Sequence, residues 1–135
     1  MVTKREIIAF LASDFPQNKS TVEAAGNRSA TVRRKIGFAD LRPGGTVSGP
    51  VLMEVADTAL YVAILAEIGI VPLAVTTNLS INFLRKPLPD RDLLGVCKLL
   101  KVGRSLVVGE VTICSAGDPD VVAHAVGTYS IPPSK

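Results

Sequence analysis

The sequence has few aromatic residues and little net charge, and both shortages limit what the protein can bind. Aromatic residues make up 4% of the chain, tryptophan is absent, and the formal net charge is +3. Binding of single-stranded nucleic acid needs a basic surface interleaved with aromatic side chains, and the sequence holds no such run. With 47% hydrophobic and 20% charged residues in 135 positions, we expect one globular domain whose core is built from Val, Ile, Leu and Ala.

Cysteine and histidine are also scarce. Cys97 and Cys114 lie far apart and match neither a CxxC pair nor a zinc spacing, which favours reduced thiols in a cytoplasmic protein. His124 is the only histidine and stands among Ala and Val, so we expect it to be structural rather than a metal ligand. Because the chain also lacks a phosphate-binding loop, a dinucleotide fingerprint and a nucleophilic serine motif, we expect neither a metal nor a cofactor.

The longest apolar run, Pro50 to Ile68, approaches the length of a membrane span. Glu54, Asp57 and Glu67 would each cost about 2.5–3.5 kcal/mol near the centre of a bilayer, so insertion is unfavourable. Residues 1–6 lack the apolar core and cleavage site of a signal peptide. We therefore expect a cytoplasmic protein without a membrane partner.

The N-terminal part of the chain predicts one short helix and one strand. Thr3 and Glu6 have the spacing of a capping box, and Pro16 ends the helix that they open. Residues 17–28 are polar and mixed, so we expect a loop or an irregular helix there. Alternation of apolar and polar residues predicts a strand over Ala30 to Leu41.

The rest of the chain predicts a long helix followed by four strands. The helix begins near Ser48–Pro50 and ends at Gly69. The strands are predicted at Val75–Phe83, Leu93–Val102, Ser105–Cys114 and Val121–Ile131. Short connections make these four strands antiparallel neighbours, and only the long helix is apolar enough to cover their shared face. We therefore expect residues 29–135 to form a curved sheet around a central helix, preceded by a helix and connecting segment at 1–28 within a single domain overall.

One side of the long helix carries a narrow polar stripe. At about 100° per residue, Glu54, Asp57, Thr58 and Tyr61 follow one another at i, i+3, i+4 and i+7. An ionised carboxylate in a buried helix costs several kcal/mol unless a partner compensates it. Asp57 is therefore either a chemical group or a structural carboxylate bonded to a hydroxyl or a neighbouring subunit, and for Glu54 we favour the structural role.

Three sequence motifs resemble those of a known family. The motifs are Pro43–Pro50 (PGGTVSGP), Val55–Ala59 (VADTA) and Ser80–Pro87 (SINFLRKP). They are similar to motifs of hotdog-fold acyl-CoA thioesterases of the phenylacetate-degradation type, and the likeness runs from roughly residue 30 to the end. The resemblance implies an α+β hotdog fold, in which a curved antiparallel sheet wraps around a long central helix.

The resemblance also implies roles for particular residues. In the family, an acidic residue nine positions after a His performs catalysis, and counting from Ser48 reaches Asp57. A backbone N–H matched by Gly49 binds the thioester oxygen, and a Ser or Thr on the following strand positions water, for which Thr76 is the best match and Thr77 the next. The chain departs from the family because Ser48 replaces the His, Pro50 replaces the second Gly of the turn, and Arg42 replaces an Asn or Gln.

Each of the other candidate site residues could have either a substrate-binding role or a purely structural role. Ser48 and Pro50 either contact substrate or only cap and start the helix, and Tyr61 either lines an acyl pocket or fills the core. Cations at strand ends either bind the phosphates of coenzyme A or form a solvated rim; these are Arg85, Lys86, Lys101 and Arg104.

The leading hypothesis is an acyl-CoA thioesterase that hydrolyses a small aryl- or medium-chain acyl-CoA. Asp57 would act as general base or as nucleophile. The alternative is a non-catalytic acyl-CoA-binding hotdog protein that serves as a sensor or carrier. A hotdog dehydratase is less favoured, because His124 has no evident acidic partner in sequence. An open sheet edge and a half-formed site favour a homodimer, with a dimer of dimers as an extension.

Overall fold

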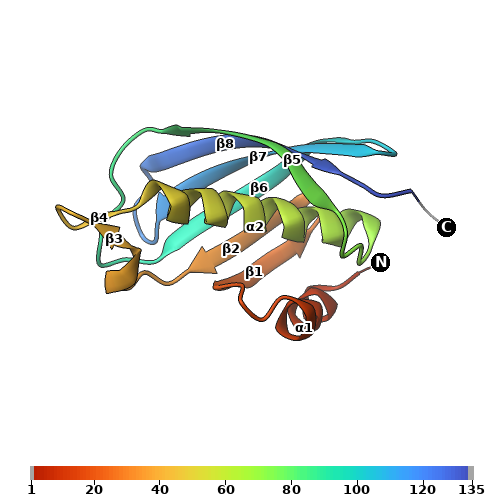
Figure 1. Cartoon of the computed structure of the whole chain (residues 1–135), viewed down its shortest axis with the longest axis horizontal. Coiled ribbons are helices and arrows are strands. Elements are labelled where there is room, and N and C mark those ends of the chain that lie inside the picture. Colours follow the sequence, from red (N-terminus) through yellow and green to blue (C-terminus); the bar gives the residue numbers. More distant parts are fainter. Residues whose placement is uncertain (1, 134–135) are drawn as a thin grey trace.

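A computed structural model of the chain describes residues 2–133, which contain two α-helices and eight β-strands. In chain order the elements are α1 Lys4–Asp14, β1 Ser20–Gly26, β2 Ser29–Arg34, a 3₁₀ turn Phe38–Asp40, β3 Leu41–Arg42, β4 Thr46–Val47, α2 Gly49–Ile68, β5 Val75–Phe83, β6 Leu93–Val102, β7 Leu106–Ser115 and β8 Val121–Ser130. Six strands form one antiparallel sheet in the order β1-β2-β6-β7-β8-β5, and β3 pairs only with β4. The sheet curves around α2, which lies along its concave face (Figure 1). This arrangement confirms the hotdog fold.

The N-terminal segment corrects one prediction. Residues 20–26 form β1, an edge strand paired with β2, where the sequence predicted a loop or irregular helix. Asn27 and Arg28 connect the two strands with φ values of 53° and 57°. Positive φ at both central residues is the geometry of the tightest hairpin turns, in which glycine usually follows asparagine. Arginine in place of that glycine hid the hairpin from the sequence pattern.

Two further predictions about the sheet were wrong. The strand predicted to reach Leu41 ends at Arg34, and residues Phe38–Asp40 form a 3₁₀ turn instead. Arg34 lies on the same buried face of the strand as Ala30 and Val32, and its side chain bonds to Asp40 of that turn. The four C-terminal strands are antiparallel, but β5 pairs with β8 rather than with β6. The connection over residues 84–92 is long enough to cross the end of the sheet, so β5 forms the edge opposite β1.

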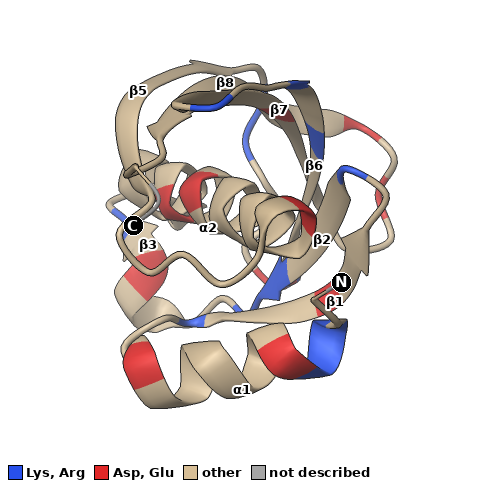
Figure 2. Cartoon of the chain, turned by 90° about the vertical axis from the view of Figure 1, so that its right-hand side faces the viewer, with Lys and Arg blue, Asp and Glu red and all other residues tan. Residues whose placement is uncertain are grey.

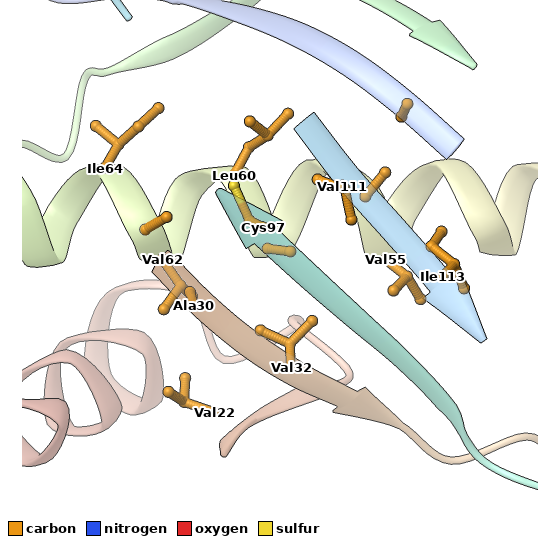
Figure 3. Packing of buried hydrophobic residues seen from close by; sticks show 14 of the residues in the cluster. Val22, Ala30, Val32, Val55, Leu60, Val62, Ile64, Cys97, Val111 and Ile113 are labelled. Atoms are coloured by element: carbon orange, nitrogen blue, oxygen red, sulfur yellow. The ribbon is translucent and has the colours of Figure 1, made fainter. Parts of the chain in front are cut away.

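Helix α2 begins and ends where the sequence predicted, with Ser48 as N-cap and Gly69 as C-cap. Most of its side chains are buried, because the sheet surrounds it on several sides (Figure 3). The helix also comes very close to β7 and β8. A methyl group added to Gly109 would lie 2.7 Å from Leu60, and one added to Gly127 would overlap the other methyl group of the same leucine. The absence of side chains at these two paired glycines therefore determines how deeply α2 sits in the sheet.

Helix α1 has the predicted capping box, in which Thr3 and Glu6 bond to each other's backbone N–H groups. Its buried residues Ile7 and Leu11 belong to the core, so the helix is attached to the domain. Figure 2 shows α1 lying below β1, with α2 enclosed by the sheet above. Neither helix of the described residues combines the length and hydropathy that a bilayer crossing requires.

Gly109→Ala tests the close approach of α2 to the sheet. The added methyl group would press on Leu60, Leu99 and Cys97, so we expect the free energy of unfolding to fall by about 1–3 kcal/mol. Gly37→Ala is the matched control, since its φ is −125° and its added methyl would meet nothing closer than 4.0 Å. Urea denaturation of both variants measures the difference, and equal stabilities would contradict the packing argument.

Candidate active site

Asp57 stands in the middle of α2 and is held by two hydroxyl groups from different strands. Its Oδ1 atom accepts hydrogen bonds from Thr76 Oγ1 of β5 at 2.6 Å and from the Tyr129 hydroxyl of β8 at 2.8 Å. The Oδ2 atom accepts no hydrogen bond from the described residues. One oxygen of the carboxylate is therefore fixed, and the other is available to a water molecule or a substrate.

The polar stripe of α2 opens into a cavity of about 430 Å³ at the β5 edge of the sheet. All four stripe residues line it, as the helical spacing predicted; they are Glu54, Asp57, Thr58 and Tyr61. Tyr61 stacks on Tyr129 with ring centroids 6.1 Å apart, and Phe10 of α1 lies 6.4 Å from Tyr61 on the other side. The cavity that Asp57 lines therefore contains four aromatic side chains, but it also contains two further carboxylates, Asp14 and Glu54.

Tyr129 is the site residue that the sequence reasoning missed. It is 3% exposed, and burial together with the charge of Asp57 raises the pKa of its hydroxyl. The hydroxyl therefore stays protonated and can donate to Asp57 across the whole ordinary pH range. A signal was present in the sequence, because Ala123, Ala125, Gly127 and Tyr129 alternate along β8 and must face α2 together.

Gly49 lies at the first turn of α2, eight residues before Asp57. That separation corresponds to roughly 12 Å along a helix. Its N–H donates no hydrogen bond within the described residues, as expected for the first turn of a helix. Gly49 opens into a different cavity of about 480 Å³, whose lining includes Phe83 and the cations Arg42, Arg85 and Lys86. Within one chain, the N–H donor and the carboxylate therefore belong to separate cavities.

The other candidate residues lie beside Gly49, on β5 outside the Asp57 cavity, or at the protein surface. Ser48 is the N-cap without a side-chain bond and Pro50 is in the first turn, so both flank Gly49. Thr77 donates to the carbonyl oxygen of Thr128 and does not line the Asp57 cavity. Arg85 pairs with Asp120 at 3.1 Å.

Lys101 and Arg104 are exposed where β6 turns into β7. They line neither the Asp57 cavity nor the Gly49 cavity. The structure therefore does not bring these two cations together with Arg85.

A buried arginine, Arg34, connects the turn before α2 with the helix itself. Arg34 is 4% exposed and donates to both carboxylate oxygens of Asp40, at 2.9 and 3.1 Å, and to Glu54 at 3.2 Å. The Asp40 carbonyl oxygen in turn accepts the Ser48 N–H at 2.9 Å. Arg34 thus ties the turn that precedes α2 to the helix itself, and it gives Glu54 the structural role that the sequence favoured.

His124 has an acidic neighbour that the sequence did not reveal. Its Nε2 lies 3.0 Å from Glu110 Oε1 on the adjacent strand β7. His124 alternates with the buried residues Ala123 and Ala125, so this pair faces away from α2 and from Asp57. Within residues 2–133, no group of three or more His, Cys, Asp or Glu side chains is placed to hold a metal, and Cys97 and Cys114 are free.

Comparisons with known proteins agree with this architecture. The sequence model of the thioesterase superfamily matches residues 44–122. The structure of a candidate thioesterase from Silicibacter sp. TM1040 has 44% sequence identity and a TM-score of 0.90, covering 98% of this chain and 94% of that one. No curated protein matches the chain in sequence.

Two structures of lower identity share the fold. A mutant of the phenylacetic acid degradation protein PaaI from Thermus thermophilus has 19% identity and a TM-score of 0.75, covering 87% of this chain and 97% of that one. A hypothetical thioesterase with coenzyme A from Streptococcus pneumoniae has 22% identity and a TM-score of 0.73, covering 86% of this chain and 88% of that one.

The Arg34–Asp40 pair predicts how stability depends on pH. Hydrogen bonds from Arg34 hold the pKa of Asp40 below its usual value of 3.8. A lowered folded-state pKa stabilises the protein above the unfolded-state value, and that stabilisation is lost as the pH falls through the folded-state value. Asp40→Asn should therefore lower the free energy of unfolding by about 1.5–3 kcal/mol at neutral pH, the usual contribution of hydrogen bonds to charged groups.

This difference between wild type and Asp40→Asn should shrink below pH 3.8 and disappear once Asp40 is protonated in the folded protein. Urea denaturation at a series of pH values measures it. Asp90→Asn, at an exposed position, is the control and should change little. A difference independent of pH would contradict the assignment.

Proposed function

Because the chain belongs to the thioesterase superfamily and is a thioester hydrolase, we propose that it hydrolyses acyl-CoA thioesters with Asp57 as the catalytic carboxylate. The observation that carries this proposal is the geometry of Asp57, which lines the cavity with one oxygen fixed by Thr76 and Tyr129 and the other without a hydrogen bond from the described residues. The aromatic rings of the cavity would contact a small aryl group or a medium-length acyl chain.

Asp57 can act in two ways. Its free oxygen can take a proton from a water molecule that attacks the thioester carbon, or it can attack that carbon itself and form an anhydride that water then hydrolyses. In both routes the C–S bond breaks and coenzyme A leaves as the thiol. Thr76 and Tyr129 keep the carboxylate oriented, so that little reorganisation is needed at the moment of reaction.

The second part of the proposal is that the site is completed by a partner subunit. β5 is an edge strand that exposes most of its residues, and pairing with a second copy would satisfy its open backbone groups. In an antiparallel two-fold pair, the Phe83 end of one β5 lies beside the Thr76 end of the other. Phe83 adjoins Gly49, and Thr76 binds Asp57. Such a homodimer would therefore bring the Gly49 of one chain towards the Asp57 of its partner.

In this dimer the Gly49 N–H would stabilise the thioester oxygen as it becomes negatively charged. The first turn of a helix carries unpaired N–H groups and partial positive charge, which favour an oxyanion. Three cations line the same cavity and would meet the phosphates of coenzyme A, and one of them, Arg85, would have to exchange its pairing with Asp120; the three are Arg42, Arg85 and Lys86. Roles for Lys101 and Arg104 in binding coenzyme A, and a dimer of dimers, stay predictions.

Asp57→Asn tests the catalytic role. The amide keeps the size of the side chain but is neither a base nor a nucleophile, so we expect release of free thiol from a panel of acyl-CoAs to fall at least about 100-fold. Thermal denaturation should show that the variant is folded. Glu67→Gln, on the same helix and paired with Arg28 outside the cavity, is the control and should retain activity. Tight binding of acyl-CoA without turnover by the wild type would favour a sensor or carrier instead.

Gly49→Pro tests the shared site. Proline removes the N–H, and Ser48 already has a ψ of 149° that a following proline requires. Because Pro50 also restricts the backbone of residue 49, thermal denaturation must first show that the variant is folded. The folded variant should be as inactive as Asp57→Asn. When the two inactive variants are refolded together, mixed dimers would contain one intact site, so about a quarter of wild-type activity should return. No recovery from demonstrably mixed dimers would refute a site shared between subunits.

A further inference from the structure

Helix α1 supplies one wall of the Asp57 cavity. Phe10, Asp14 and Phe15 all line it, facing the stripe residues of α2 and the start of β5. The helix is anchored from beneath by Ile7, which is fully buried, and by Leu11. The wall is therefore a fixed part of the domain, and the N-terminal segment contributes to the site.

A second cavity of about 520 Å³ lies on the other side of the same wall, between α1 and β1. Its lining contains no charged side chain and is mainly apolar; it consists of Ile8, Leu11, Ala12, Phe15, Pro16, Asn18, Ser20, Thr21 and Val22. The Ser20 hydroxyl is buried and has no hydrogen-bond partner within the described residues. This uncharged cavity therefore suits methylene groups along most of its lining, with the polar side chains of Asn18, Ser20 and Thr21 on one part of it.

Phe15 is the residue that lines both cavities. Its backbone is held on both sides, because its N–H donates to Leu11 at 2.9 Å and its carbonyl oxygen accepts the Asn18 N–H at 3.0 Å. Pro16 follows and prevents the helix from continuing. Phe15 is thus the one lining residue that the Asp57 cavity shares with the mainly apolar cavity beside it.

We propose that Phe15 limits the length of the acyl group that the site accepts. With the thioester carbonyl at Asp57, the acyl group extends past Tyr61 and Phe10 and ends against the Phe15 ring. The second cavity becomes part of the acyl pocket only when that ring is made smaller. This inference rests on the proposed function, since it assigns the Asp57 cavity to the acyl part of the substrate.

A series of Phe15 substitutions tests the proposal, with straight-chain acyl-CoAs from acetyl to palmitoyl as substrates. Phe15→Ala should raise the ratio of kcat/KM for long chains to that for short chains at least about tenfold, because each additional buried methylene gains binding energy. Phe15→Leu should raise the ratio less, and Phe15→Trp should lower it. Phe38→Ala, at a residue that is 93% exposed and lines neither cavity, should leave the ratio unchanged.

Binding measurements separate this proposal from the proposed function. Acyl-CoA analogues with a thioether in place of the thioester cannot be hydrolysed, so calorimetry reports their affinity without turnover. Phe15→Ala should strengthen binding of the long analogues relative to the short ones, even if the wild type releases no thiol from any acyl-CoA. A uniform change across all chain lengths, in folded Phe15→Ala or in the milder Phe15→Leu, would overturn the assignment. Wild-type inactivity with selective binding would overturn only the proposed hydrolysis.

Discussion

The close contact between Leu60 and two paired glycines controls the position of every other part of the site. Gly109 and Gly127 lie opposite each other on β7 and β8, and the two methyl groups of Leu60 fill the space above them. Because α2 can sit this deep, Asp57, less than one turn before Leu60, reaches the hydroxyl of Tyr129, two residues beyond Gly127. A helix held further from the sheet would separate these two groups, so the packing of one leucine determines the hydrogen bonding of the carboxylate.

Two hydroxyls from different strands orient the carboxylate of Asp57, which is half-buried at the wall of the cavity. Thr76 and Tyr129 both donate to one oxygen, and the raised pKa of Tyr129 keeps its proton in place. Concentrating both donors on Oδ1 leaves Oδ2 unbonded within the described residues. This second oxygen is the one that the proposed reaction uses, either as a base or as a nucleophile.

The sequence predicted the parts of this site that depend on periodicity. The ends of α2, the polar stripe from Glu54 to Tyr61 and the bounds of β5 follow from spacing along one segment, and the structure confirms them. The alternation within β5 is interrupted by a register shift between Thr76 and Asn78. Tyr129 was missed because its contact with Asp57 joins residues 72 positions apart, a pairing that depends on strand order. The edge strand β1 was missed because its hairpin depends on positive φ values at Asn27 and Arg28, which the sequence pattern does not reveal. The bonds of Arg34 were missed because one partner, Asp40, lies in the following turn and the other, Glu54, lies on α2.

In the proposed site, the residues that perform the reaction and the residue that limits the acyl group lie at different parts of the domain. The groups proposed to perform the reaction lie on α2 and β5, at the sheet edge where a second chain can pair, so the rate would depend on assembly. Phe15, which is proposed to limit the acyl group, caps the C-terminus of α1, and α1 packs within its own chain against β1 at the other sheet edge. A change at Phe15 would therefore alter which acyl group fits without moving Asp57 or the edge of β5.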